Sequence, residues 1–167
     1  MKIKNILLII LTLALIAVLA SCSSPSDKTD GTNDDEDTPF APDILALRDK
    51  MISDFGNHDA ITFESDVLLD LYGIAGEDVA ESACYMTMDG VFPQEIIMIK
   101  ATNEDALSRI STSLENRISE VKTQSENYDP ENYALAQKCK VATRGLYVTM
   151  FLSPNFDEMT EMFNLAK

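Results

Sequence analysis

A long amphipathic segment separates two pairs of short apolar runs, and this order limits the fold more than any other feature of the chain. The segment opens at Thr102, and Asp105 three residues later completes the pattern of a capping box. Its apolar residues then recur at helical spacing: Leu107, Ile110, Leu114, Ile118 and Val121. This spacing predicts one long helix with a buried face and a solvent-exposed face.

The first pair of runs alternates with a period of two residues. Cys84, Met86 and Met88 share one side of a predicted strand, and a second strand follows over 95–100. Between them, Asp89 and Gly90 supply turn chemistry. The pattern predicts a hairpin ahead of the long helix.

The second pair of runs follows the long helix and has the same character. We expect strands at 139–143 and 146–152, with a turn at Arg144 and Gly145. Two hairpins joined by a helix predict an α+β fold. Its sheet should be four-stranded and largely antiparallel, with the helices packed mainly on one face.

Four shorter helices complete the expected order of elements. They are a helix at 44–55 ending at Gly56, one at 67–74 stopped by Gly73, one begun by Asp129 and Pro130, and a last helix from Ser153 or Asn155 that buries Phe156, Met159 and Phe163. Together with the hairpins, they predict one α+β globular domain over 43–167.

The N-terminus has the pattern of a lipoprotein signal peptide. Lys2 and Lys4 precede an apolar run over 6–19, which is shorter than the about 20 residues that a bilayer-spanning helix needs. The run ends in Leu-Ala-Ser-Cys, so we expect a signal peptide at 1–21, cleavage between Ser21 and Cys22, and a lipid on the Cys22 sulfur. An uncleaved membrane helix and a secretory peptide cut after Ala20 remain alternatives. The expected location is the extracytoplasmic face of the cell membrane, where the lipid would anchor the protein.

Residues 22–42 are rich in Ser, Thr, Asp, Asn and Pro, with an acidic run at 34–37. Such a composition cannot bury enough apolar surface to offset the entropy of ordering, so it predicts a disordered acidic linker. The chain carries a net charge of -15, and loss of Lys2 and Lys4 would make it about -17. This charge disfavours nucleic acid as a partner. The remaining candidate partners are the membrane, reached through the lipid, and an envelope protein or a wall polymer.

Four stretches, at 68–74, 95–100, 128–133 and 145–148, resemble a family of small lipoproteins of Gram-positive bacteria that carry a domain of unknown function. The resemblance covers about residues 45–165. It implies a lipoprotein with an α+β domain, and it implies no reaction, so no catalytic residue is carried over.

Candidate chemical groups are few. His58 is the single histidine and lies in a polar loop, where an imidazole is usually only a surface residue. Glu64, Asp66 and Asp70 lie close in sequence, and two carboxylates suffice for glycoside hydrolysis, although no Trp is present to stack against a sugar. Such acidic clusters are expected by chance in so acidic a chain.

The sulfur-containing residues suggest a second alternative. Cys84, Met86, Met88, Met98 and Met150 fall in predicted neighbouring strands, and thiolate and thioether donors select Cu(I). Methionine used as adaptable core filling is the favoured interpretation.

Cys84 and Cys139 could form a disulfide, or they could be two buried thiols, which we favour. The prediction for function is therefore a noncatalytic binding or scaffold module of the cell envelope. The alternatives are a small-ligand or Cu(I) receptor and a cell-wall hydrolase. No catalytic, cofactor or metal residue is assigned.

Overall fold

The computed structural model describes residues 40–87 and 93–167. The helices are α2 (Ile44–Asp54), α3 (Ser65–Tyr72), α4 (Glu104–Ser125), α5 (Pro130–Lys138) and α6 (Phe156–Leu165), with a short 3-10 helix η1 (Gly76–Asp78). The strands are β1 (Ile61–Phe63), β2 (Val79–Met86), β3 (Glu95–Ala101), β4 (Val141–Arg144) and β5 (Tyr147–Leu152). The α+β prediction is confirmed.

All five strands form one antiparallel sheet in the order β1-β2-β3-β5-β4. The prediction of four strands is wrong because it missed β1. This strand is only three residues long, and Phe63 pairs with Cys84, far along the chain. A strand so short and without a local hairpin turn leaves no periodic pattern in the sequence.

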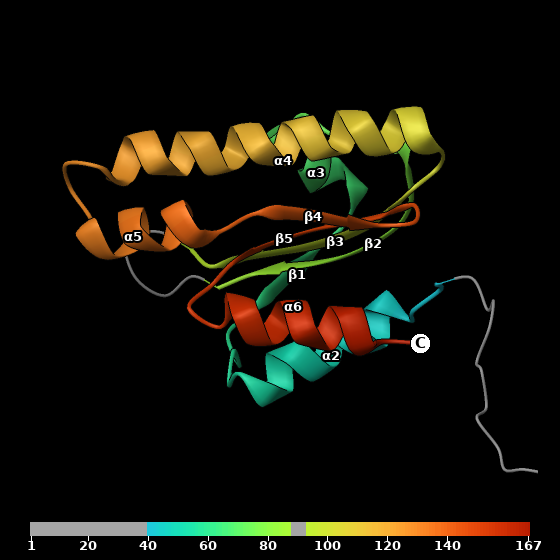
Figure 1. The fold of residues 1–167 in the computed structure, drawn as a ribbon, viewed down its shortest axis with the longest axis horizontal. Coiled ribbons are helices and arrows are strands. Elements are labelled where there is room, and N and C mark those ends of the chain that lie inside the picture. Colours follow the sequence, from blue (N-terminus) through green and yellow to red (C-terminus); the bar gives the residue numbers. More distant parts are fainter. Residues whose placement is uncertain (1–39, 88–92) are drawn as a thin grey trace, which may run out of the picture. The chain divides into compact units, whose positions relative to one another are not determined.

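The helices cover both faces of the sheet, so the prediction that they pack mainly on one face is also wrong. Helices α3, α4 and α5 lie on one face, and α2 and α6 lie on the other (Figure 1). Every residue of β5 is buried, and so is all of β3 except Lys100. Because both faces of these central strands are apolar, each face needs its own layer of helix.

Most predicted helix ends are confirmed. As predicted, α3 ends at Gly73 with φ of +67°, and the Asp129 side chain accepts a hydrogen bond from the Asn132 N–H at 3.1 Å at the start of α5. The structure adds Asp43 as the N-cap of α2, where its side chain accepts from the Ala46 N–H at 2.9 Å. Helix α4 differs, because Asn103 rather than Thr102 is its N-cap: the Asn103 side chain accepts from the Ala106 N–H at 2.9 Å.

Strand ends differ more from the expectation. Strand β2 begins at Val79, ahead of the predicted start at Cys84, and β4 begins at Val141 rather than at Cys139. The β4–β5 turn occupies Gly145 and Leu146, one residue later than predicted, with φ of +56° at Gly145. Met88 and the predicted turn at 89–90 lie outside the described residues.

Phe40 is the first described residue, and its ring packs against the domain. The Phe40 ring lies edge-on to Tyr147 at 5.4 Å and to Phe163 at 5.2 Å between ring centroids. The Arg144 guanidinium lies 3.8 Å from the centre of the Phe40 ring. The predicted signal peptide, Cys22 and the acidic run lie outside the part of the chain that the structure describes. Within the described part, no helix combines the length and the apolar character needed to cross a membrane.

Candidate functional site

A groove runs between α4 and the segment formed by α3 and η1. It consists of two hollows of about 570 and 360 Å³, and Gly73 and Ser113 line both of them. Hydroxyl and amide groups of α4 line the groove: Ser108, Thr112, Ser113 and Asn116. Each hollow also contains an arginine of α4 that is paired with a carboxylate.

The first pair is the buried one. Arg117 Nη2 donates to Glu95 Oε1 at 2.5 Å, and Arg117 Nε donates to Glu95 Oε2 at 3.1 Å. The Tyr72 hydroxyl donates to Glu95 Oε2 at 3.0 Å. Glu95 is 1% exposed, so this carboxylate depends on its two partners in place of water.

Arg117 and Tyr72 both remain protonated beside the buried Glu95 carboxylate. Hydrogen bonding to Glu95 raises the pKa of Arg117 well above its ordinary value. Burial, and then the charge of Glu95, raise the pKa of Tyr72. Tyr72 therefore remains a neutral hydrogen-bond donor, and the three groups join α3, β3 and α4 at one end of the groove.

The second pair is more open to solvent. Arg109 Nη2 and Nε donate to the two carboxylate oxygens of Asp78 at 2.5 and 2.9 Å. The Asp78 residue is buried, whereas the Arg109 side chain is 60% exposed. The hydrogen bonds from Arg109 hold the pKa of Asp78 below its usual range. This pair ties η1 to α4 at the other end of the groove.

The groove is lined mainly by polar residues. Its two guanidinium groups and two of its carboxylates neutralise one another, while its hydroxyl and amide groups lie between the two pairs. Among the described residues, every buried polar side-chain atom has a hydrogen-bond partner. Two further carboxylates also line the groove, Glu77 and Glu120, so its lining keeps an excess of negative charge.

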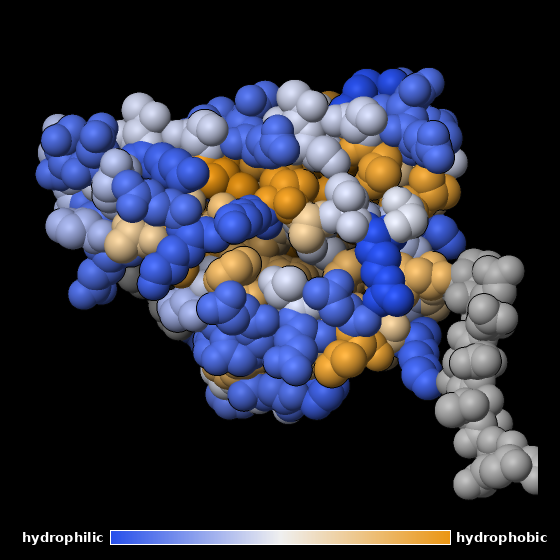
Figure 2. Space-filling view, viewed as in Figure 1, coloured by the Kyte–Doolittle hydropathy of each residue, from blue (hydrophilic) through white to orange (hydrophobic). Residues whose placement is uncertain are grey.

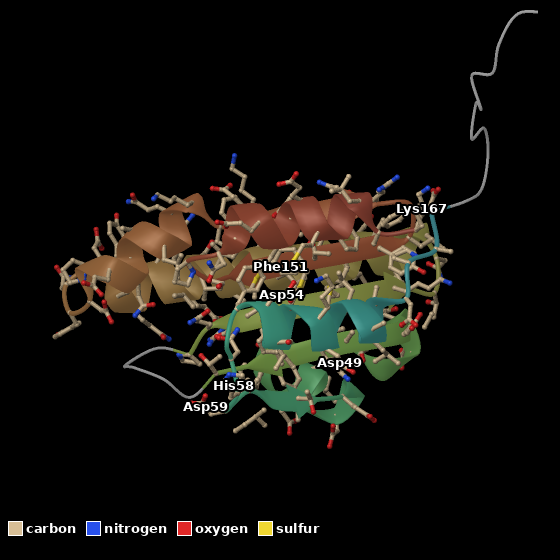
Figure 3. All side chains as sticks on the ribbon, turned by 90° about the horizontal axis from the view of Figure 1, so that it is seen from below. Asp49, Asp54, His58, Asp59, Phe151 and Lys167 are labelled. Atoms are coloured by element: carbon tan, nitrogen blue, oxygen red, sulfur yellow. The ribbon has the colours of Figure 1, made fainter. Side chains whose placement is uncertain are left out.

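The sequence-predicted polar residues lie elsewhere. His58 and Asp59 are exposed in the segment after α2 (Figure 3). Their neighbour Asn57 is buried instead, and it donates to the Tyr85 hydroxyl at 3.1 Å. The three acidic candidates of the hydrolase alternative are all exposed and do not line the groove: Glu64, Asp66 and Asp70.

The sulfur-containing residues are not gathered at one place. Cys84, Met86 and Met150 belong to the face covered by α3, α4 and α5, whereas Met98 belongs to the opposite face. Cys84 and Met150 both pair with Ile97, so strand β3 separates their sulfurs. Within residues 40–87 and 93–167, no group of three His, Cys, Asp or Glu side chains is placed to hold a metal ion.

Cys84 and Cys139 are free and buried, which confirms the favoured interpretation of two apolar thiols. The Cys139 Sγ donates to the Phe151 carbonyl at 3.3 Å, and the Cys84 Sγ donates to the Met98 carbonyl at 3.9 Å. Burial raises the pKa of each thiol to about 12. Both are therefore poor nucleophiles at neutral pH.

Sequence reasoning missed the buried pair of the groove. Two weak signals were present: Glu95 opens an otherwise apolar run, and Arg117 stands between Leu114 and Ile118 in the long helix. A charged residue beside core positions often reaches a buried partner, but the sequence does not identify that partner.

The family comparison covers the whole of this site. Residues 53–153 match the family model described as a domain of unknown function (DUF4358), and this range contains all five strands together with α3, η1, α4 and α5. Comparisons with curated proteins and with solved structures gave no match. The matched residues are more than half of the chain, and the protein therefore belongs to the DUF4358 family.

Proposed function

We propose that this protein is a lipid-anchored, noncatalytic binding module on the extracytoplasmic face of a Gram-positive cell membrane. The observation that carries the binding role is the groove between α3–η1 and α4. Its arginines Arg109 and Arg117 are paired with Asp78 and Glu95, and these pairs hold the walls together. The Ser113 hydroxyl, the Asn116 amide and the Glu77 carboxylate also line the groove and can bind an envelope component such as a protein or a wall polymer.

The anchor rests on the sequence around Cys22. An n-region with two lysines, a short apolar run and the closing Leu-Ala-Ser-Cys support cleavage before Cys22 and lipidation of its sulfur. One acyl chain binds a membrane only weakly, whereas two hold a protein stably, so a diacylglyceryl group would suffice.

Metabolic labelling with an alkyne fatty acid tests the anchor. The native chain should be labelled and should remain with the membrane fraction, whereas Cys22→Ala should be unlabelled and released or left unprocessed. Ser24→Ala, which leaves the four-residue pattern intact, is the matched control. Retention of label in Cys22→Ala would contradict the proposal.

Crosslinking to isolated envelopes tests the groove. Ser113→Tyr should fill it where the two hollows meet, while Gln137→Tyr adds the same ring at an exposed position of α5. We expect Ser113→Tyr to lose the crosslinked species that both the native chain and Gln137→Tyr form. Equal crosslinking by all three proteins would show that the groove is not the binding site.

A further inference from the structure

We propose that the open edge of strand β4 docks an extended acidic peptide segment, which adds a further strand to the sheet. This surface lies on the other side of α4 from the candidate groove, so the inference is independent of both the groove and the lipid anchor.

The backbone of β4 has hydrogen-bonding groups that no strand among the described residues pairs with. Strand β4 is the last strand of the sheet, and its register with β5 pairs Arg144 with Tyr147 around a two-residue turn. In such a hairpin, the pair next to the turn is hydrogen-bonded and the pattern then alternates. The N–H and C=O groups of Val141 and Thr143 therefore point away from β5, toward solvent.

A hollow lies beside this edge. It has a volume of about 380 Å³ and lies between β4 and α4, where Ile118, Cys139 and Val141 line it with apolar atoms. Hydrophobic side chains are visible at the surface between α4 and β4, with hydrophilic residues around them (Figure 2). A strand that pairs with β4 would point every second side chain toward α4, so the hollow could receive one apolar side chain of the partner.

The charge of this edge is opposite to that of the rest of the chain. Residues 132–156 contain no Asp or Glu, although the chain as a whole carries a net charge of -15. Lys122 lines the hollow together with Lys140, and Lys138 is exposed nearby in sequence. These three lysines take part in none of the salt bridges among the described residues.

The lysines select a partner strand by its charge. A basic edge repels a second copy of the same edge and any other basic strand, which is how lysine protects edge strands from indiscriminate pairing. An acidic strand is attracted instead. Glu115, the acidic residue that lines the hollow, is about two helical turns from Lys122 along α4. The partner that fits is thus an extended segment that presents both an apolar and an acidic side chain on its face toward α4, where Val141 and Lys122 line the same hollow.

Fluorescence anisotropy tests the charge selection. The probe is a labelled eight-residue peptide with the repeat Val-Val-Glu-Glu, which presents both residue types on each face of a strand, added to the full-length chain in a nonionic detergent. We expect the peptide to bind, and we expect Lys122→Glu with Lys140→Glu to weaken the binding at least tenfold. A peptide with Lys in place of Glu should not bind. Absence of binding by the acidic peptide, or equal binding by the two peptides, would overturn the proposal.

Two substitutions of one residue separate strand addition from a simple charge contact. Thr143→Pro removes an N–H that the sheet does not use, a change that edge strands tolerate, while Thr143→Ala keeps it. Thr143→Pro should abolish peptide binding and Thr143→Ala should preserve it. Equal binding by both variants would overturn strand addition.

Hydrogen exchange on the native chain decides the same point if Thr143→Pro fails to fold. The amides of Val141 and Thr143 should exchange more slowly once the peptide is bound. Unchanged exchange at both amides under saturating peptide would also overturn the proposal.

Discussion

The two faces of the sheet are covered by helices of different character. Helices α3, α4 and α5 lie within the residues that match the DUF4358 family, whereas α6 lies outside the match and α2 almost wholly so. The face of the sheet covered by α3, α4 and α5 is therefore the family-matched face, and it contains the Glu95–Arg117 pair and both free thiols. The opposite face is built mainly from apolar and aromatic contacts and contains Phe40, Tyr147, Phe151 and Phe163.

The two faces differ in whether they contain buried ion pairs. On the family-matched face, buried charged groups connect separate elements, and they also form the walls of the groove. On the opposite face, apolar and aromatic burial supplies most of the stability, and Arg144 and Lys100 lie against aromatic rings. The groove that we propose for binding thus belongs to the face covered by α3, α4 and α5, and α2 and α6 cover the second side of the sheet.

The largest expected effect concerns the two thiols of the family-matched face. In a Cys22→Ala chain, Cys84 and Cys139 are the remaining cysteines. With pKa values near 12 rather than 9, their thiolate fraction at pH 8 is lower by roughly a thousandfold. We expect an aromatic disulfide reagent to react with them very slowly in the folded chain and rapidly in urea. Rapid reaction of the folded chain would show that this face is open.

The same pKa shifts predict that the free energy of unfolding falls as the pH rises above about 9. A thiol whose pKa is raised by folding stabilises the native state below about pH 9, and this stabilisation is lost as the pH rises toward 12. Urea unfolding at a series of alkaline pH values should show this fall in the free energy of unfolding.

Removal of Arg117 should have the largest effect on stability. Arg117→Met keeps most of the side-chain volume but leaves the buried Glu95 carboxylate without its cation, which costs about 3–5 kcal/mol. Urea denaturation measures the change. Adding Glu95→Gln to the same chain should restore part of the loss, because it removes the uncompensated charge. A loss below about 1 kcal/mol for Arg117→Met would show that the pair is not buried as described.

The opposite face should respond to loss of apolar volume. Met51 of α2 is fully buried, and Met51→Ala should lower the free energy of unfolding by about 2–5 kcal/mol through the cavity that it leaves. Leu45 of the same helix is 43% exposed, so Leu45→Ala is the matched control and should cost far less. Equal losses would mean that α2 does not pack on the sheet through Met51.

A neutral hydrogen bond on the opposite face gives a smaller effect. Asn57→Ala leaves the Tyr85 hydroxyl without its partner, which should cost about 1–3 kcal/mol. Tyr85→Phe in the Asn57→Ala background should recover most of this loss, because no unpaired hydroxyl then remains. Failure of the double variant to recover stability would assign the loss to packing rather than to the hydrogen bond.

The smallest effect is expected where the chain enters the compact unit. Arg144→Ala removes the cation above the Phe40 ring and should cost about 0.5–1 kcal/mol. Lys50→Ala, at an exposed position of α2, is a control for loss of a surface cation. Proteolysis near Phe40 should become faster in Arg144→Ala but not in Lys50→Ala. Unchanged proteolysis would show that the cation does not hold Phe40 in place.

Local sequence signals were sufficient for most individual elements. The five helices follow from apolar spacing and from caps such as Gly73 and Asp129, because these signals act within a few residues of the helix end. The two hairpins follow from alternation, because each pairs segments that are close along the chain. The shift of the α4 cap from Thr102 to Asn103 is a choice between two neighbouring capping residues.

The sequence by itself thus determined the α+β class, the helices and four strands, and it supports the prediction of an anchor at Cys22. The tertiary structure decided the pairing of β1 with β2, the helical cover on both faces, and the meeting of Tyr72, Glu95 and Arg117. The reason is physical. Helix caps and hairpin turns are local interactions, whereas a three-residue edge strand and a buried ion pair are stabilised only by partners that the folded chain brings together from distant positions.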